Sequence, residues 1–382
     1  MENNYNKMFV LNKIDNDNKR KIRNPGIDSV RVLGMYAIIV HHILHFSKLF
    51  QKYKQYKELV LMNISCFWHV SSYALISGYI GYKSIKYSNL LYLWICVFFY
   101  SIGIIYLYEY KLKANNGKIV FEYYFPVYYN KFWYFTKYFG MFLFLPVVNK
   151  GIVFLTKYEL RIAVIRLILV YVVFKDIIAP YKDTFVMNSG YSVIWLLIYY
   201  LTGAYFGKFK TQYNRTKKII LILLCIFVFY LSTYLCYYFS DYPLDNSKGY
   251  LKIKAIKVLK HIFVLRISSV PMILQSISIA LLLTEINYNK YLAKIVTFIG
   301  PLTFGTYIIH THPIILGNIL KKLFIKESQN LSLNIVIKLV LIRGLKIFGI
   351  CLIIDYLRNI LFIFIRLRKI CIFFERIICK IF

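Results

Sequence analysis

The chain has 382 residues, of which 59% are hydrophobic and 19% aromatic, and its 49 basic and 16 acidic side chains give a net charge of +33. A soluble globular chain is about half apolar and about a quarter charged, so this composition excludes most soluble classes of protein. A nucleic-acid binder would share the charge but would be less apolar, and a disordered basic tail would not contain 31 Phe and 37 Tyr. A membrane protein satisfies both numbers, because its helices lie in lipid while Lys and Arg in its loops face anionic headgroups. We therefore expect membrane lipids, and no nucleic acid, as partners.

Ten segments contain the roughly 20 mostly apolar residues that a membrane-crossing helix needs. In chain order they are 29–48, 61–82, 89–109, 131–149, 160–179, 190–207, 218–239, 262–284, 296–317 and 333–354. The connections between them are too short to form a separate soluble domain. The sequence therefore predicts an all-α polytopic membrane protein with about ten transmembrane helices in a single bundle.

The segments before and after the bundle are predicted to lie in the cytosol. Residues 1–28 are polar and basic and lack a small-residue cleavage site, which is typical of a retained first helix rather than of a secretory signal. Ten spans return the chain to the side on which it began, and the basic residues at both ends agree with the positive-inside rule. Residues 359–382 alternate apolar residues with Arg and Lys, so we expect a basic amphipathic tail on the inner leaflet, with a frayed tail as the alternative. This division leaves 29–358 as the membrane domain.

Histidines are the most informative polar residues of the chain, because ionisable side chains are costly inside a membrane and mark function there. Six of the seven lie in predicted spans: His41, His42, His45, His69, His310 and His312. For any single histidine the alternative is a structural hydrogen bond between helices. His41 and His45 have the i, i+4 spacing of a zinc pair, but no carboxylate accompanies them, so we expect no metal.

Arg31 and His42 are predicted to share one face of the first span. Eleven residues at 100° each exceed three full turns by about 20° and rise roughly 16 Å. Arg31 would then lie at the cytosolic mouth, where a guanidinium can hold a phosphate. His42 would lie inside the bundle, where an imidazole can accept a proton from a hydroxyl nucleophile and return it to a leaving group. Asp28, three residues before Arg31, can pair with it or cap the helix.

A second pair of histidines, His310 and His312, lies in the ninth predicted span. The two residues are two positions apart, so on a helix their side chains point about 200° apart. Unless Pro313 distorts the backbone, only one of them can face a small site. We expect one histidine to be catalytic or substrate-facing and the other to be structural.

Five short patterns follow one another along most of the chain. They are Ile27-Asp28-Ser29-Val30-Arg31 followed by His42, Ser71 to Tyr79 with its Ser77-Gly78 pair, Phe132-Trp133-Tyr134, Gly190 to Tyr205, and Tyr307-Ile308-Ile309-His310. In this order they resemble acyltransferase family 3, the integral-membrane acyltransferases that modify bacterial surface polysaccharides, and in particular its polysaccharide O-acetyltransferase branch. The chain departs from the family pattern at position 41, which is also His, and after the second helix, where only Lys83 and Lys86 replace an Arg-rich stretch.

The resemblance implies a membrane O-acyltransferase in the bacterial plasma membrane. Its expected donor is cytosolic acetyl-CoA, and its expected acceptor is a hydroxyl of a cell-surface polysaccharide, such as a capsule, or of a lipid-linked precursor. His42 matches the essential histidine of the family and Arg31 its basic partner. On this interpretation His42 and His310 are catalytic, and Arg31 and Asp28 bind the donor. His42 would be the base or a transient acyl carrier, and a hydrogen bond from His310 would orient the acceptor or His42.

The same resemblance assigns the substrate-binding role to residues that also have simpler explanations. These residues are Trp133, Tyr134, Ser77 and His312. Trp133 and Tyr134 would equally suit an aromatic belt at the membrane interface. Ser77-Gly78 would equally suit a close contact between two helices.

Two other functions are compatible with the sequence. An exporter or translocator of a surface polysaccharide or lipid-linked sugar would line a path with the same histidines and tyrosines, although the chain lacks inverted halves with paired broken helices. An assembly partner without chemistry of its own predicts that no single histidine matters. A homodimer and a polysaccharide-synthesis complex both remain as alternatives for the assembly.

Overall fold

In a computed structural model of the protein, the described residues are 23–112, 117–179, 182–210, 213–241, 256–260, 262–263, 266–328 and 330–381. Most of the predicted N-terminal segment 1–28 therefore falls outside the described residues. Within the described part of the chain, all regular structure is helical, which confirms the all-α prediction.

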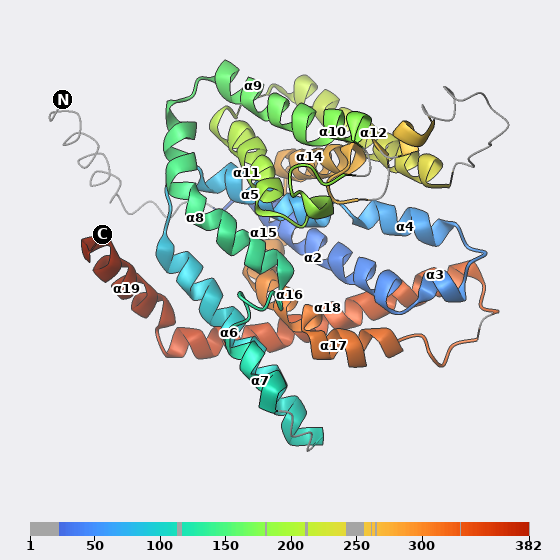
Figure 1. Ribbon diagram of the computed structural model, residues 1–382, viewed down its shortest axis with the longest axis vertical. Helices are drawn as coiled ribbons and strands as arrows, with labels where there is room; N and C mark the ends of the chain where they lie inside the picture. The colour runs from blue at the N-terminus through green and yellow to red at the C-terminus, as the bar shows by residue number, and fades with distance from the viewer. Residues whose placement is uncertain are drawn as a thin grey trace.

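The helices form one bundle with α2 near its middle (Figure 1). The first of them are α2 (Pro25–Phe46), α3 (Leu49–Lys52), α4 (Glu58–Cys66), α5 (His69–Gly81), α6 (Tyr87–Leu112), α7 (Gly117–Tyr124), α8 (Trp133–Phe154), α9 (Lys157–Ile168) and α10 (Lys175–Ile178). The others are α11 (Val193–Lys208), α12 (Arg215–Asp241), α14 (Val270–Glu285), α15 (Lys290–Ile299), α16 (Thr303–Thr311), α17 (Pro313–Asn318), α18 (Leu333–Phe364) and α19 (Leu367–Ile381). A π-helical turn (Leu169–Phe174) joins α9 to α10, and short 3-10 turns lie at Asn188–Gly190, Gly300–Leu302 and Leu320–Lys322.

Six helical stretches of the described residues are long and apolar enough to cross a membrane. They are Pro25–Phe46, Glu58–Gly81, Tyr87–Tyr108, Trp133–Phe154, Arg215–Phe239 and Lys290–Thr311. The other four predicted spans coincide with α9 to α10, α11, α14 and α18, which are not among these six. The protein is therefore a helical membrane protein, and the number of ten spans stays a prediction.

Helix α2 lies in the middle of the bundle, where it contacts α4, α5, α14, α15, α16 and α18 (Figure 1). The side chain of Asn24 accepts a 2.8 Å hydrogen bond from the Gly26 N–H, and Pro25 follows as the first helical residue. Both features are typical of a helix N-terminus. A single unbroken helix then continues to Phe46 and carries both Arg31 and His42.

Two clusters of buried apolar side chains fill the bundle. One is built on α5, α8, α11 and α14 and includes Leu75 and Met141. The other is built on α2, α6, α16 and α18 and includes Ile39. Tyr73 and Tyr134 pack against both clusters. These two tyrosines therefore lie at the junction between the two halves of the core.

Glycines allow α5 and α11 to pack backbone against backbone. A Cβ atom on Gly78 would lie 1.9 Å from the carbonyl oxygen of Tyr200, and one on Gly203 would lie 1.8 Å from the carbonyl oxygen of Leu75. Such distances leave no room for any larger residue, as in other close contacts between membrane helices. Gly78, in the Ser77-Gly78 pair of the second span, therefore has a packing role.

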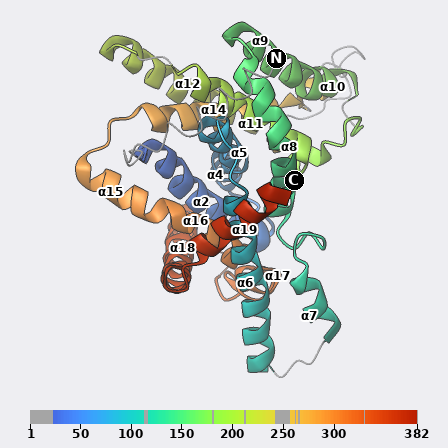
Figure 2. The same ribbon diagram turned by 90° about the vertical axis from the view of Figure 1, so that its left-hand side faces the viewer.

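The chain changes direction sharply after α18. Arg366 has a φ of +56°, in the left-handed region that residues other than glycine rarely adopt. The turn sends α19 back across the bundle, where it packs against α6 (Figure 2). Within the predicted tail 359–382, residues up to Phe364 extend α18, and the separate helix begins at Leu367.

Candidate active site

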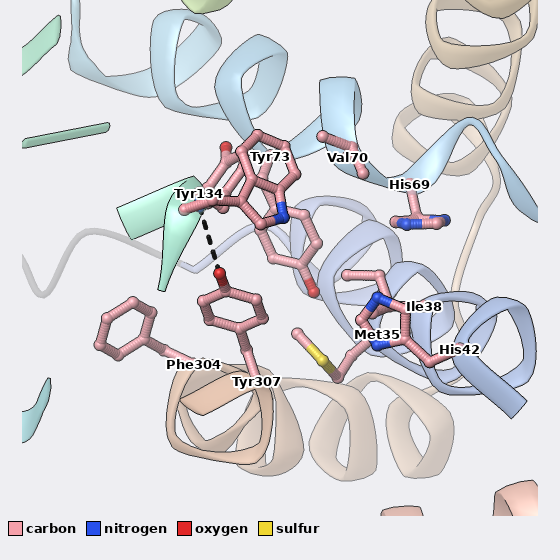
Figure 3. Close-up of a pocket in the computed structure, with 10 residues that line it drawn as sticks. Met35, Ile38, His42, His69, Val70, Tyr73, Tyr134, Phe304 and Tyr307 are labelled. Carbon is pink, nitrogen blue, oxygen red and sulfur yellow. Dashed lines mark hydrogen bonds between the residues drawn. The ribbon is translucent and has the colours of Figure 1, made fainter. Parts of the chain in front are cut away.

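A small cavity lies at the junction of the two halves of the core (Figure 3). Four helices line it: α2 with Met35, Ile38 and His42, α5 with His69, Val70 and Tyr73, α8 with Trp133 and Tyr134, and α16 with Phe304 and Tyr307. His42 and His69 lie at one end, and Tyr134, Phe304 and Tyr307 lie at the other. The cavity volume of about 50 Å³ accommodates a few water molecules or a group of a few heavy atoms.

His42 and His310 form a hydrogen bond between α2 and α16. The distance between Nδ1 of His42 and Nε2 of His310 is 3.2 Å. Nδ1 of His310 lies 2.7 Å from the carbonyl oxygen of Thr306, one helical turn earlier. The sequence predicted both histidines as site residues, with a hydrogen bond between His310 and either the acceptor or His42, and in the structure the partner of His310 is His42.

The bond to Thr306 fixes which nitrogen carries the proton on both rings. A carbonyl oxygen only accepts, so Nδ1 of His310 carries a hydrogen and its Nε2, in the neutral ring, is an acceptor. Nδ1 of His42 must therefore donate to His310, which leaves Nε2 of His42 with a free lone pair. Since His42 lines the cavity, this arrangement gives the cavity an oriented proton acceptor.

His69 also lines the cavity, although the sequence reasoning did not select it. Its Nδ1 donates to the carbonyl oxygen of Cys66, and the side chain is 1% exposed. The only signal in the sequence was a polar ring inside a predicted span, because no motif includes this histidine. With Nδ1 occupied, Nε2 is the nitrogen of His69 that can interact with a bound group.

The neighbouring histidines of α2 lie outside the cavity lining. Nδ1 of His41 is 2.7 Å from Oδ1 of Asn63, and His45 is exposed and stacks on His41 with ring centroids 5.9 Å apart. Of the adjacent histidines His41 and His42, only His42 lines the cavity. In the described part of the chain, no three His, Cys, Asp or Glu side chains are placed to hold a metal ion.

Arg31 lies near the start of α2 in a charge cluster around the buried Asp28. The carboxylate of Asp28 is fully buried and accepts hydrogen bonds from Arg31 at 2.7 Å and from Arg23 at 2.8 Å. Gly300 is packed against it, because a Cβ there would lie 2.4 Å from Oδ1 of Asp28. Asp28 is thus committed to holding two guanidinium groups, of which that of Arg31 is 25% exposed.

Tyr73 connects the Arg31 end of α2 to the cavity. Its hydroxyl donates a 2.7 Å hydrogen bond to the carbonyl oxygen of Arg31, while its ring lines the cavity. The Tyr73 side chain therefore joins the backbone of α2 at Arg31 to the His42 cavity.

The residues predicted to bind substrate divide into two groups. Trp133 and Tyr134 line the cavity, and the backbone N–H of Tyr134 donates a 3.3 Å hydrogen bond to the hydroxyl of Tyr307 (Figure 3). Ser77 does not line the cavity. Its hydroxyl donates a hydrogen bond to the carbonyl oxygen of Tyr73, one turn earlier on α5.

His312 likewise lies away from the cavity and is fully buried. Its Nδ1 accepts from the N–H of Ile314 and caps α17, and its Nε2 lies 3.3 Å from the carbonyl oxygen of Ser101. Of the two histidines in the ninth predicted span, His310 therefore reaches His42, while both nitrogens of His312 take part in structural contacts.

The acyltransferase domain model of acyltransferase family 3 matches residues 24–356, and the chain therefore belongs to this family. The match contains every residue that lines the cavity as well as Asp28 and Arg31. Comparison with curated proteins and with solved structures gives no significant match. The protein is accordingly a membrane acyltransferase.

Proposed function

We propose that the protein transfers an acetyl group from cytosolic acetyl-CoA to a hydroxyl of a cell-surface polysaccharide or of its lipid-linked precursor, in the plasma membrane of a bacterium. The observation that carries the proposal is the chain of bonds from Thr306 through His310 to His42. It leaves an oriented, unprotonated Nε2 at a cavity of acetyl-like size. Such a group is what an acyl transfer to a hydroxyl requires.

In the proposed reaction, His42 acts as general base and then as general acid. Its Nε2 takes the proton of the acceptor hydroxyl as the hydroxyl oxygen attacks the thioester carbonyl carbon. The tetrahedral intermediate then collapses, the carbon–sulfur bond breaks, and the thiolate takes the proton from His42. The products are an ester and free CoA, and His42 returns to its neutral form. His310 accepts from Nδ1 of His42 throughout, which holds the ring in the reactive tautomer.

The donor would bind with its phosphates at Arg31 and its thioester at His42. A guanidinium suits a phosphate because it donates two parallel hydrogen bonds, and Asp28 holds that of Arg31 in place. Eleven residues of α2 separate the two sites by roughly 16 Å. The pantetheine arm of CoA is an extended chain that would run between them beside Tyr73.

Labelled acetyl-CoA and the purified full-length protein test this proposal. We expect transfer of the label to a polysaccharide acceptor by the unaltered protein and by His41→Ala, and none by His42→Ala. His41 is a matched control, because it is the adjacent histidine on the same helix but bonds to Asn63 outside the cavity. Equal transfer by His42→Ala would refute the assignment of the base.

A further inference from the structure

A strongly basic groove lies at the turn between α18 and α19, away from the cavity. Its cations are Lys86, just before α6, and Arg366, Arg368 and Lys369, at the turn itself. Two hollows of about 210 and 290 Å³ make up the groove, and Tyr92 and Arg368 line both of them. We propose that this basic groove binds the phosphate of an anionic phospholipid from the surrounding membrane. The proposal is independent of the reaction described above.

The charge of the groove is unbalanced. Four cations line it against one carboxylate, that of Glu375. Within the described residues, none of the four cations forms an ion pair with an acidic side chain, whereas Arg31, Arg343 and Arg358 each do so. Two guanidinium groups and two ammonium groups on one surface are the typical ligands of a phosphate diester.

The groove rests on a buried ion pair. The guanidinium of Arg368 lies over the ring of Tyr92, 4.8 Å from its centroid. The hydroxyl of Tyr92 accepts a 2.9 Å hydrogen bond from Arg358, whose guanidinium forms two bonds of 2.8 and 2.9 Å with Asp355. Both members of this ion pair are buried, so Tyr92 is a fixed platform under Arg368.

The left-handed turn at Arg366 positions three of the four cations of the groove. This backbone conformation is costly for arginine, and such conformations are concentrated at functional sites. The turn places Arg366, Arg368 and Lys369 against Tyr92 and Lys86 of another segment. A continuous helix through residue 366 would carry these cations away from α6.

Exposed apolar side chains next to the groove indicate that its ligand is a lipid rather than a free phosphate. Ile363 and Phe364, at the end of α18, are 66% and 85% exposed. Phe373 and Ile378 of α19 are 60% and 48% exposed. A helix that combines exposed apolar residues with Lys and Arg lies in the membrane interface, with its apolar side chains among the lipid tails. Under the predicted cytosolic C-terminus, this interface is the inner leaflet.

Native mass spectrometry of the full-length protein in detergent, with phosphatidylglycerol or phosphatidylcholine added, tests the proposal. We expect retention of phosphatidylglycerol in preference to phosphatidylcholine. Since one cation near an anionic membrane surface contributes about a fivefold change in binding, we expect Arg368→Ala to lower retention about fivefold. Lys369→Gln, a milder change on the same groove, should lower it in the same direction if Arg368→Ala fails to fold.

Arg376→Ala is the matched control, because Arg376 is an exposed arginine of α19 that does not line the groove. It should retain phosphatidylglycerol like the unaltered protein. Equal losses in Arg376→Ala and Arg368→Ala would overturn the proposal in favour of unspecific attraction by the tail. Displacement of phosphatidylglycerol by adenosine 3′,5′-bisphosphate would overturn it as well, because the groove would then bind a nucleotide phosphate.

Discussion

Replacing His310 by alanine removes the only acceptor that the described residues offer to Nδ1 of His42. The ring of His42 then loses its 3.2 Å partner and the constraint that selects its tautomer. A buried donor without a partner costs about 1–3 kcal/mol. If this cost appears in the transition state, kcat falls by about 5- to 150-fold.

The assay is the steady-state transfer of labelled acetyl to an acceptor by the purified protein. We expect a lower kcat with an unchanged KM for acetyl-CoA, since His310 does not line the cavity and its contacts are with His42 and Thr306. His310→Gln should recover much of the lost rate, because its amide oxygen can accept from Nδ1 of His42. A wild-type kcat in His310→Ala, or equal rates in His310→Ala and His310→Gln, would refute the reasoning.

Three further predictions concern packing, acyl size and pH. Gly305→Ala should destabilise the fold by about 1–3 kcal/mol, because the new Cβ would lie 1.7 Å from Oδ1 of Asp355. Its control is Gly349→Ala, which adds a Cβ in open space and should not lower the unfolding temperature. Met35→Ala enlarges the cavity and should raise the ratio of kcat/KM for butyryl-CoA to kcat/KM for acetyl-CoA about tenfold. Met272→Ala removes a methionine buried in a different cluster and should leave this ratio unchanged. A hydrogen bond from Arg343 lowers the pKa of Glu327 below its ordinary value of 4.5. The ionised carboxylate therefore stabilises the fold above pH 4.5, and this stabilisation is lost as the pH falls through the lowered pKa. Glu327→Gln should therefore flatten the acid side of the stability profile measured by thermal unfolding, and an unchanged profile would contradict the assignment.

Helical periodicity predicted one part of the site from the sequence. Arg31 and His42 lie eleven residues apart on one helix, so their relation depends only on local geometry. The same reasoning predicted that only one of His310 and His312 faces a small site, but α16 ends at Thr311, so the break before Pro313 and not helical spacing separates the two side chains. In the structure, His310 reaches His42, and His312 caps α17.

The rest of the site depends on contacts between distant segments, which periodicity does not determine. His42 and His310 are 268 residues apart in the sequence, and their bond requires α2 and α16 to pack with one particular offset along their axes. His69 belongs to no motif and reaches the cavity only because α5 packs against α2. Ser77 lies in a motif, but Gly78 beside it packs directly against the backbone of α11. A short motif therefore did not distinguish a packing role from a binding role.

The composition of the surface polysaccharide in a deletion strain shows whether His42 is required for O-acetylation. A strain without the gene would be complemented with the unaltered protein, His41→Ala or His42→Ala, and O-acetyl ester would be measured on the exported polymer. We expect exported polymer in every strain, with ester present only for the unaltered protein and His41→Ala. Polymer retained inside the cells, or ester restored by His42→Ala, would contradict this expectation.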